Sequence, residues 1–148
     1  MSSVRESLRK AGPLARFVDV PLDCDELALA LVDEVNPSLT HLRLETNRLT
    51  DAGVQSLCRA LSLLPEGTWR AGTPRRPPPP ALRLQSLRTL YLSNQPGFGD
   101  AGAEHVAGVL RENGVLTWLN LQANDIGAAG AAALADALKD NTACQQVP

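Results

Sequence analysis

The sequence predicts an α/β solenoid, a short right-handed superhelix of strand and helix units with a parallel concave sheet and helices on its convex side. The first observation is a leucine pattern, L-x-x-L-x-L, that occurs three times in the 148 residues. The second is the segment after each copy, where apolar residues recur at helical spacings. The third is composition: 44% of the residues are hydrophobic but only 3% are aromatic, so Leu, Val and Ala must form a core of thin layers.

The strand half of each unit opens on the leucine pattern, at Leu39, Leu87 and Leu116. The three segments are LTHLRLETNRL, LRTLYLSNQPGF and LTWLNLQANDI. Each segment leads through a glycine-containing turn into the predicted helix, and these turns are TDAG, GDAG and GAAG at residues 50–53, 99–102 and 127–130. The repeating unit is therefore strand, turn and helix.

The first two repeats are separated by an insertion. The leucine pattern recurs after 29 residues between Leu92 and Leu121, but after 48 residues between Leu44 and Leu92. The surplus lies at 65–81, PEGTWRAGTPRRPPPPA, which cannot continue a helix and is predicted to extend as a polyproline-type loop. Its P-x-x-P stretches lack the flanking residues typical of SH3, WW or EVH1 ligands, which favours a tolerated loop over a recognition motif.

Before the first full repeat, residues 24–35 are predicted to form an apolar-faced helix that ends at Asn36-Pro37. Phe17–Val20 is interpreted as a degenerate strand, which makes residues 1–38 an N-terminal cap and partial repeat. After Asn141 the pattern requires another L-x-x-L strand, but the chain continues as TACQQVP. This tail either folds over the last repeat as an atypical cap, leaves an open end for a partner, or marks a truncated product.

The predicted strand and turn motifs, with an Ala- and Leu-rich helix that ends in LKDN, resemble the ribonuclease-inhibitor type of leucine-rich repeat over residues 24–142. In this the chain is similar to repeats of NOD-like receptors, ribonuclease inhibitor and the activator of the Ran GTPase. The resemblance implies that the chain presents a surface to another macromolecule. The expected divisions of the repeat region 39–148 are 39–64 for repeat 1, 65–81 for the insertion, 82–115 for repeat 2, 116–142 for repeat 3 and 143–148 for the tail.

The resemblance also implies a structural role for two asparagines. Asn47 and Asn124 follow the last Leu of the first and third strands, where the side chain is expected to satisfy backbone groups in the turn. In the second repeat Asn94 falls one place early and Gln95 takes the expected position. A bulge or a substitution by Gln follows, so we expect this turn to be the least regular.

The outward positions of the three strands are the predicted binding surface. Strand alternation turns Leu42 and Leu44 into the core and sends their neighbours onto the concave face. Stacked repeats give three outward columns, which are His41, Thr89 and Trp118, then Arg43, Tyr91 and Asn120, then Glu45, Ser93 and Gln122. Because Trp, Tyr and Arg are enriched among interface hot spots, we predict that this patch binds a protein. The alternative is that these residues only fill strand positions that suit aromatic side chains.

No catalytic, cofactor-binding or metal-binding group is predicted. Residues 97–102, GFGDAG, match G-x-G-x-x-G, but the neighbouring repeats carry similar turns, so the motif is interpreted as a property of the repeat. His41 and His105 fall on different elements and suggest no metal or acid–base pair. Cys58 lies on an apolar helix face, where a free Cys behaves as a small core residue. We expect a protein that is not an enzyme.

Charge and cysteine content narrow the setting. Fourteen Lys and Arg against sixteen Asp and Glu give a formal charge of −2, which implies neither a nucleic-acid nor a membrane partner. Cys24, Cys58 and Cys144 fit neither a disulfide framework nor a metal-ligand pair, which favours a reducing cytoplasm, with a cilium or the cytoskeleton as further settings. Neither a signal peptide nor a membrane-spanning stretch is recognised.

The sequence therefore predicts a non-catalytic interaction module that binds a protein partner of unknown identity through its concave sheet. Two alternatives remain. The first is a structural subunit of a larger complex, such as a ciliary, axonemal or ribonucleoprotein assembly. The second is a regulator similar to the GTPase activator.

Overall fold

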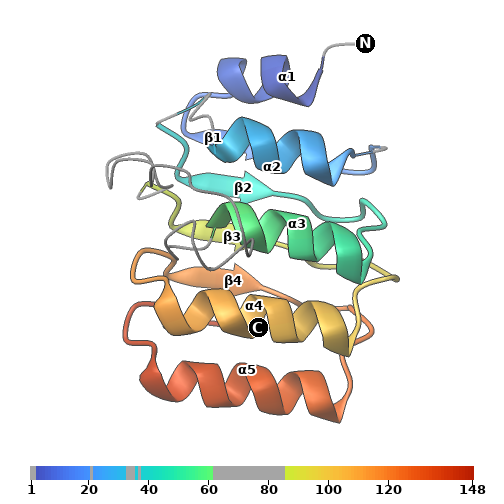
Figure 1. The fold of residues 1–148 in the computed structure, drawn as a ribbon. Helices are drawn as coiled ribbons and strands as arrows, with labels where there is room; N and C mark the ends of the chain where they lie inside the picture. The colour runs from blue at the N-terminus through green and yellow to red at the C-terminus, as the bar shows by residue number, and fades with distance from the viewer. Residues whose placement is uncertain (1–2, 21, 33–35, 37, 62–85) are drawn as a thin grey trace, which may run out of the picture.

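The structure, a computed structural model, describes residues 3–20, 22–32, 36, 38–61 and 86–148. Short strands alternate with helices along this part of the chain (Figure 1). The elements in order are α1 (Val4–Lys10), β1 (Leu14–Arg16), α2 (Cys24–Val32), β2 (His41–Arg43), α3 (Asp51–Leu61), β3 (Thr89–Tyr91), α4 (Asp100–Glu112), β4 (Trp118–Asn120) and α5 (Ala128–Asp140).

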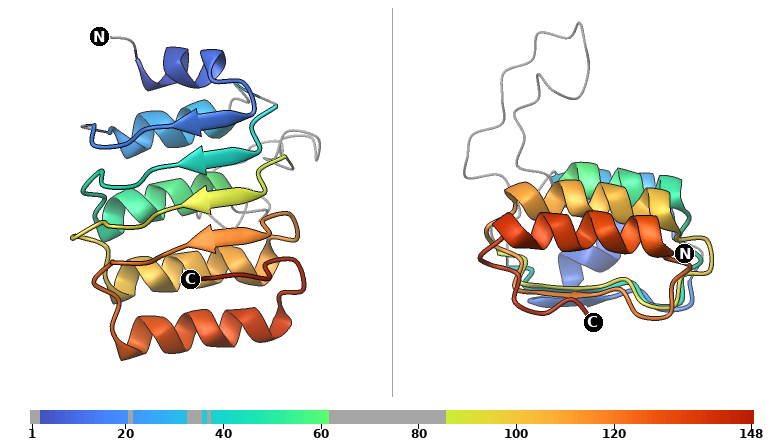
Figure 2. Two further views of the ribbon diagram at one scale, coloured as in Figure 1. Left: turned by 180° about the vertical axis from the view of Figure 1, so that it is seen from behind. Right: turned by 90° about the horizontal axis from the view of Figure 1, so that it is seen from below.

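The four strands form one parallel sheet in the order β1-β2-β3-β4, so strands that follow one another along the chain are also neighbours in space. Helices α2 to α5 stack on one side of this sheet, as the view from below shows (Figure 2). Helix α1 lies across the N-terminal end of the stack, where its Leu8 is fully buried. The predicted α/β solenoid is confirmed.

The leucine pattern places one layer of core in each repeat. Leu42, Leu90 and Leu119 face one another across adjacent strands and are 0–2% exposed. The helices add apolar positions from their inner faces, including Leu57 of α3 and Leu110 of α4, each 1% exposed. Burial of one such side chain stabilises the fold by about 1.5 to 3 kcal/mol, so the repeated leucines supply most of the core energy.

A ladder of side-chain amides connects the turns that follow the strands. Asn47 and Asn124 each donate Nδ2 to a carbonyl of their own repeat, Leu44 O and Leu121 O, at 3.0 and 2.9 Å. Gln95 stands between them, fully buried, and its Oε1 accepts from the backbone N–H groups of Asn47 and Leu49, both at 3.0 Å. Gln95 N in turn donates to Asn124 Oδ1 at 2.7 Å. Gln therefore replaces Asn in the second repeat without interrupting the ladder.

The displaced Asn94 has a separate explanation. The residue before each ladder position has a left-handed backbone, with φ of 62° at Thr46, 59° at Asn94 and 55° at Ala123. Asn tolerates this conformation better than most L-residues, so position 94 suits it. The extra residue of this repeat lies after the ladder, at Pro96-Gly97, where Gly97 forms a parallel bridge to Thr50. The irregularity is therefore an insertion next to a regular turn.

A second ladder joins the helix N-termini. Asp51 Oδ1 accepts from the N–H groups of Gly99 and Gly102, both at 2.8 Å, and so caps α4 from the preceding repeat. Asp100 caps α5 in the same way through Gly127 and Gly130, at 2.7 and 2.9 Å. A Cβ on Gly102 would lie 2.6 Å from Asp51 Oδ1, so the turn requires glycine for the carboxylate to approach.

The predicted strand at Phe17–Val20 is wrong. Strand β1 lies three residues earlier, and its Ala15 pairs with Leu42 in the buried leucine position. Phe17–Val20 forms the turn after the strand, where Asp19 has a φ of 54° and Val20 N donates to Asn47 Oδ1 at 3.0 Å. The β-branched and aromatic residues here favoured a strand by propensity, but register with β2 and the amide ladder determine the backbone.

The C-terminal tail covers the free edge of β4. Gln146 forms a parallel bridge to Trp118, Leu119 N donates to Gln146 O at 3.0 Å, and Leu121 N donates to Pro148 O at 2.9 Å. The tail therefore extends the sheet beside the last strand. Of the predicted alternatives, this arrangement is closest to an atypical cap.

The tail also begins like a further repeat. Asn141 Oδ1 accepts from Cys144 N at 2.6 Å, as Asn113 Oδ1 accepts from Leu116 N at 2.8 Å. Cys144 is 7% exposed, and Val147 packs against the same core. The tail therefore carries an equivalent of L-x-x-L, in which Cys144 and Val147 take the leucine positions.

Replacement of Gln95 by Ala is expected to lower the free energy of unfolding by about 2 to 4 kcal/mol, because it leaves several buried backbone groups without partners. Urea unfolding measures the change. The shorter Gln95→Asn should also destabilise the chain, whereas Gln122→Ala, at an exposed position, should change the free energy by less than about 0.5 kcal/mol. Equal effects at positions 95 and 122 would contradict the ladder.

Replacement of Ala123 by Gly is expected to raise the free energy of unfolding by about 0.5 to 1 kcal/mol, because glycine adopts the left-handed backbone without steric cost. The matched control is Ala132→Gly, at an exposed position inside α5, which should lower it by about 1 kcal/mol. Thermal unfolding of the two variants should therefore shift in opposite directions. A shift in the same direction would exclude a strained turn at Ala123.

Candidate binding face

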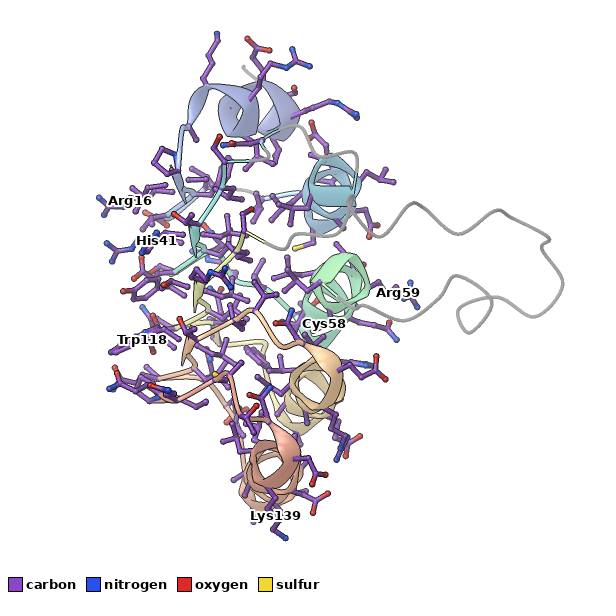
Figure 3. The ribbon with its side chains drawn as sticks, turned by 90° about the vertical axis from the view of Figure 1, so that its left-hand side faces the viewer. Arg16, His41, Cys58, Arg59, Trp118 and Lys139 are labelled. Atoms are coloured by element: carbon purple, nitrogen blue, oxygen red, sulfur yellow. The ribbon has the colours of Figure 1, made fainter. Side chains whose placement is uncertain are left out.

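The outward residues of the strands form one surface on the side of the sheet opposite the helices. Figure 3 shows Arg16, His41 and Trp118 projecting from this side, whereas Arg59 extends from the helix layer. The structure therefore presents the strand residues and the helix residues to different surroundings.

The register brings the predicted columns together. His41 pairs with Thr89 and Thr89 with Trp118, while Arg43 pairs with Tyr91 and Tyr91 with Asn120. Backbone hydrogen bonds continue the alignment beyond the strands, from Thr46 N to Ser93 O at 3.3 Å and from Asn94 N to Gln122 O at 2.9 Å. The third column, Glu45, Ser93 and Gln122, therefore lies beside the second.

Arg43 is held by two neighbours on this face. Its Nη2 and Nε donate to the carboxylate of Glu45 at 2.7 and 3.2 Å, and its guanidinium lies 4.7 Å from the centroid of the Tyr91 ring. The hydrogen bond to Glu45 raises the pKa of the Arg43 guanidinium, with a further contribution from the charge of Glu45. The Arg43 side chain remains 36% exposed. Arg43 is therefore an oriented and largely neutralised cation.

Exposure divides the first column. His41 is exposed, but Thr89 is only 8% exposed and contributes little area to a partner. Trp118 is half-buried, and its Nε1 is shielded from solvent with no hydrogen-bond acceptor among the described residues. This column therefore presents to a partner the His41 side chain and the apolar surface of the Trp118 ring, but not the Trp118 N–H group.

Two outward residues were missed because the first strand was misplaced. Leu14 pairs with His41 and is 48% exposed, and Arg16 pairs with Arg43 and is also exposed. The first and second columns therefore extend by one strand toward the N-terminus. The available signal was spacing, since Ala15 precedes Leu42 by 27 residues, close to one repeat of about 28.

The G-x-G-x-x-G motif is already occupied by the protein itself. The N–H groups of Gly99 and Gly102, which would face a phosphate in a dinucleotide site, donate to Asp51. A second anion at this helix end would be repelled by the Asp51 carboxylate. The motif therefore serves the stacking of repeats.

The three cysteine thiols are buried or partly buried. Burial raises the pKa of the Cys58 thiol to about 12, and burial with the nearby Asp23 and Asp25 charges raises that of Cys24 to about 11. Burial also raises the pKa of the Cys144 thiol. Across the described ranges no three His, Cys, Asp or Glu side chains are grouped to hold a metal ion. The His41 ring contacts the Thr40 hydroxyl at 2.8 Å.

A small core cavity offers no ligand site either. It measures about 10 Å³ and is lined by apolar side chains of the sheet and of α3 and α4, including Leu57, Val106 and Leu119. This is about the space of one water molecule, and the lining has no polar partner for it. The predicted Pro-rich insertion at 65–81 lies outside the described residues. None of the helices described is long and apolar enough to cross a lipid bilayer.

Known proteins share these repeats. The family profile described as Leucine Rich repeat matches residues 35–58 and 113–135. Ribonuclease inhibitor from Sus scrofa is 35% identical over an alignment of 162 residues. The alignment covers 82% of this chain and 34% of the inhibitor. The human NACHT, LRR and PYD domains-containing protein 12 is 35% identical over 122 residues, which cover 82% of this chain and 9% of that protein. The chain thus spans about a third of the inhibitor and under a tenth of the human protein.

A solved structure shares the fold. The leiomodin-1 actin-binding site 2 superposes with a TM-score of 0.72 at 16% sequence identity, over 99% of this chain and 79% of that one. At this identity the likeness concerns the backbone arrangement alone.

Cys58 is expected to resist alkylation in the folded chain. At about pH 8 an ordinary thiol, with a pKa of about 8.5, is partly ionised and reacts. The buried Cys58 thiol, with a pKa of about 12, is almost wholly protonated at this pH. Iodoacetamide labelling followed by peptide mass spectrometry should show little modification of Cys58 until urea unfolds the chain. Rapid labelling of Cys58 under native conditions would show that the α3 core opens.

Proposed function

This chain is a leucine-rich-repeat protein of the ribonuclease-inhibitor type, and we propose that it binds a protein partner through the concave face of its sheet and catalyses no reaction. Leucine-rich repeats generally mediate protein–protein interaction. The observation that carries the proposal is the Arg43–Tyr91 stack, which Glu45 holds by an ion pair and which shares with Trp118 a face that no helix of the described chain covers.

Preorganisation supports this choice of face. A flexible Arg loses side-chain entropy when a partner orders it, at a cost of about 0.5 to 1.5 kcal/mol. Glu45 and Tyr91 already hold the Arg43 guanidinium, so most of this cost is met on folding. Tyr91 and Trp118 are rigid by comparison and present ring surface at diagonal positions of the neighbouring strands β3 and β4. These are properties of hot-spot residues.

The free thiols support a reducing compartment such as the cytoplasm as the place of action. Cys24, Cys58 and Cys144 are all free, and they lie in α2, in α3 and in the C-terminal tail. The names of the relatives supply a first defined probe, since the pig protein is by name an inhibitor of ribonuclease. A ribonuclease is therefore a defined first probe for direct binding to this chain, which spans a third of that relative.

Site-specific photocrosslinking in cells tests the proposal. A benzophenone amino acid at Asn120, which pairs with Tyr91 on the concave face, should crosslink to a discrete protein, whereas the same group at Arg59, on α3, should not. Trp118→Ala in the crosslinkable chain should reduce the yield as expected for a hot spot of about 2 kcal/mol, roughly 30-fold in affinity. Thermal unfolding checks that the variant remains folded.

Two outcomes would contradict the proposal. One is equal crosslinking from Asn120 and Arg59, which would indicate nonspecific contact. The other is crosslinking from Arg59 alone, which would move the binding surface to the helices. Recovery of the chain only within a stable complex of many subunits would favour the alternative of a structural subunit.

A further inference from the structure

Charge is distributed unevenly between the two faces of the solenoid. Helices α2 to α5 carry eight acidic side chains against three basic ones. The outward positions of β1 and β2 carry Arg16, His41 and Arg43 and no acidic residue. A chain with a slightly negative total charge therefore presents a basic area at the N-terminal half of its concave face.

One carboxylate forms an ion pair with a side chain of this basic area in the described part of the chain. It belongs to Glu45, whose two oxygens are both engaged by Arg43. Arg16 pairs in register with Arg43 and is exposed, and within the described ranges no carboxylate lies within ion-pair distance of it. Glu45 thus neutralises one of two adjacent guanidinium groups and leaves the charge of Arg16 uncompensated.

Like charges directly opposite each other on neighbouring strands are destabilising unless a counter-charge is present, and Glu45 supplies one to Arg43 but not to Arg16. Strands in a sheet are separated by about 4.8 Å, so an incoming carboxylate between them could accept from both guanidinium groups. Leu14, half exposed on the same strand, lies one outward position away from Arg16 and opposite His41. The pair of Arg16 and Leu14 is therefore complementary to a peptide in which an acidic residue lies next to an apolar one.

We infer that the concave face recognises an acidic segment of its protein partner, with an Asp or Glu carboxylate bound at Arg16 beside Arg43 and an apolar side chain placed on Leu14. The inference rests on the proposed function and adds the chemistry of the partner. The acidic helices repel such a segment while the basic strands attract it, within a screening length of about 8 Å at physiological salt. The acidic segment is therefore steered to the concave face of the sheet and away from the helices.

Selection from a library of random peptides displayed on phage tests the inference with a defined probe. The intact chain should enrich peptides that contain Asp or Glu next to an apolar residue. Arg16→Gln should weaken the selected peptides roughly 10- to 100-fold, as for a hydrogen bond to a charged group. The matched control Arg59→Gln, an exposed arginine on α3, should leave binding unchanged.

A charge swap gives the sharper measurement. Arg16→Glu should abolish binding of an acidic peptide, and a peptide in which Lys replaces the critical acid should regain binding to Arg16→Glu but not to the unaltered chain. Thermal unfolding of Arg16→Gln and Arg16→Glu checks that substitution at this exposed position leaves the fold intact. Binding of the acidic peptides should also weaken as salt is raised.

The inference is overturned if selection yields no acidic peptides, either because nothing is enriched or because the enriched peptides are neutral or basic. It is equally overturned if Arg16→Glu and Arg59→Glu weaken the acidic peptides alike. Loss of neutral peptides in Trp118→Ala would still uphold the proposed function. Peptides that bind regardless of both Arg16 and Trp118 would count against both proposals.

Discussion

The fold depends on the supply of hydrogen-bond partners to the backbone in the turns between strand and helix. A buried N–H or carbonyl without a partner costs about 1 to 3 kcal/mol, and each repeat brings such groups into the interior. The side chains of Asn47, Gln95 and Asn124 meet this requirement across repeat boundaries as well as within them. Each repeat therefore needs its neighbour for its own turn, which makes the array cooperative along its length.

The carboxylates of Asp51 and Asp100 impose the same dependence at the helix N-termini. They also occupy the glycine-containing turns at the starts of α4 and α5. A glycine-rich helix start is an anion site in other folds, and here the anion is a side chain of the preceding repeat. The N–H groups at the starts of α4 and α5 therefore serve the contact between repeats.

The leucine repeat predicted the elements in which leucine occupies the core positions. The prediction failed where another residue takes a leucine position. Leucines placed β2, β3 and β4 and their outward columns, but Ala15 in β1 and Cys144 in the tail occupy leucine positions and were not recognised. Gln95 was identified as the residue at the turn position, yet the hydrogen bonds of its side chain to the preceding repeat depend on geometry that spacing does not give. Whether the nine outward residues bind a partner stays a prediction.

Pattern alone also cannot tell which outward residues are available to a partner. Thr89 lies in the correct column but is buried between its neighbours, and Arg43 is partly satisfied by Glu45, so equal sequence positions differ in what they offer. This difference separates two contributions to binding. An oriented Arg43 favours slow dissociation because little order remains to be imposed, whereas an uncompensated Arg16 favours fast association through long-range attraction. The concave face can therefore both attract a partner and hold it, because Glu45 neutralises Arg43 and leaves Arg16 charged.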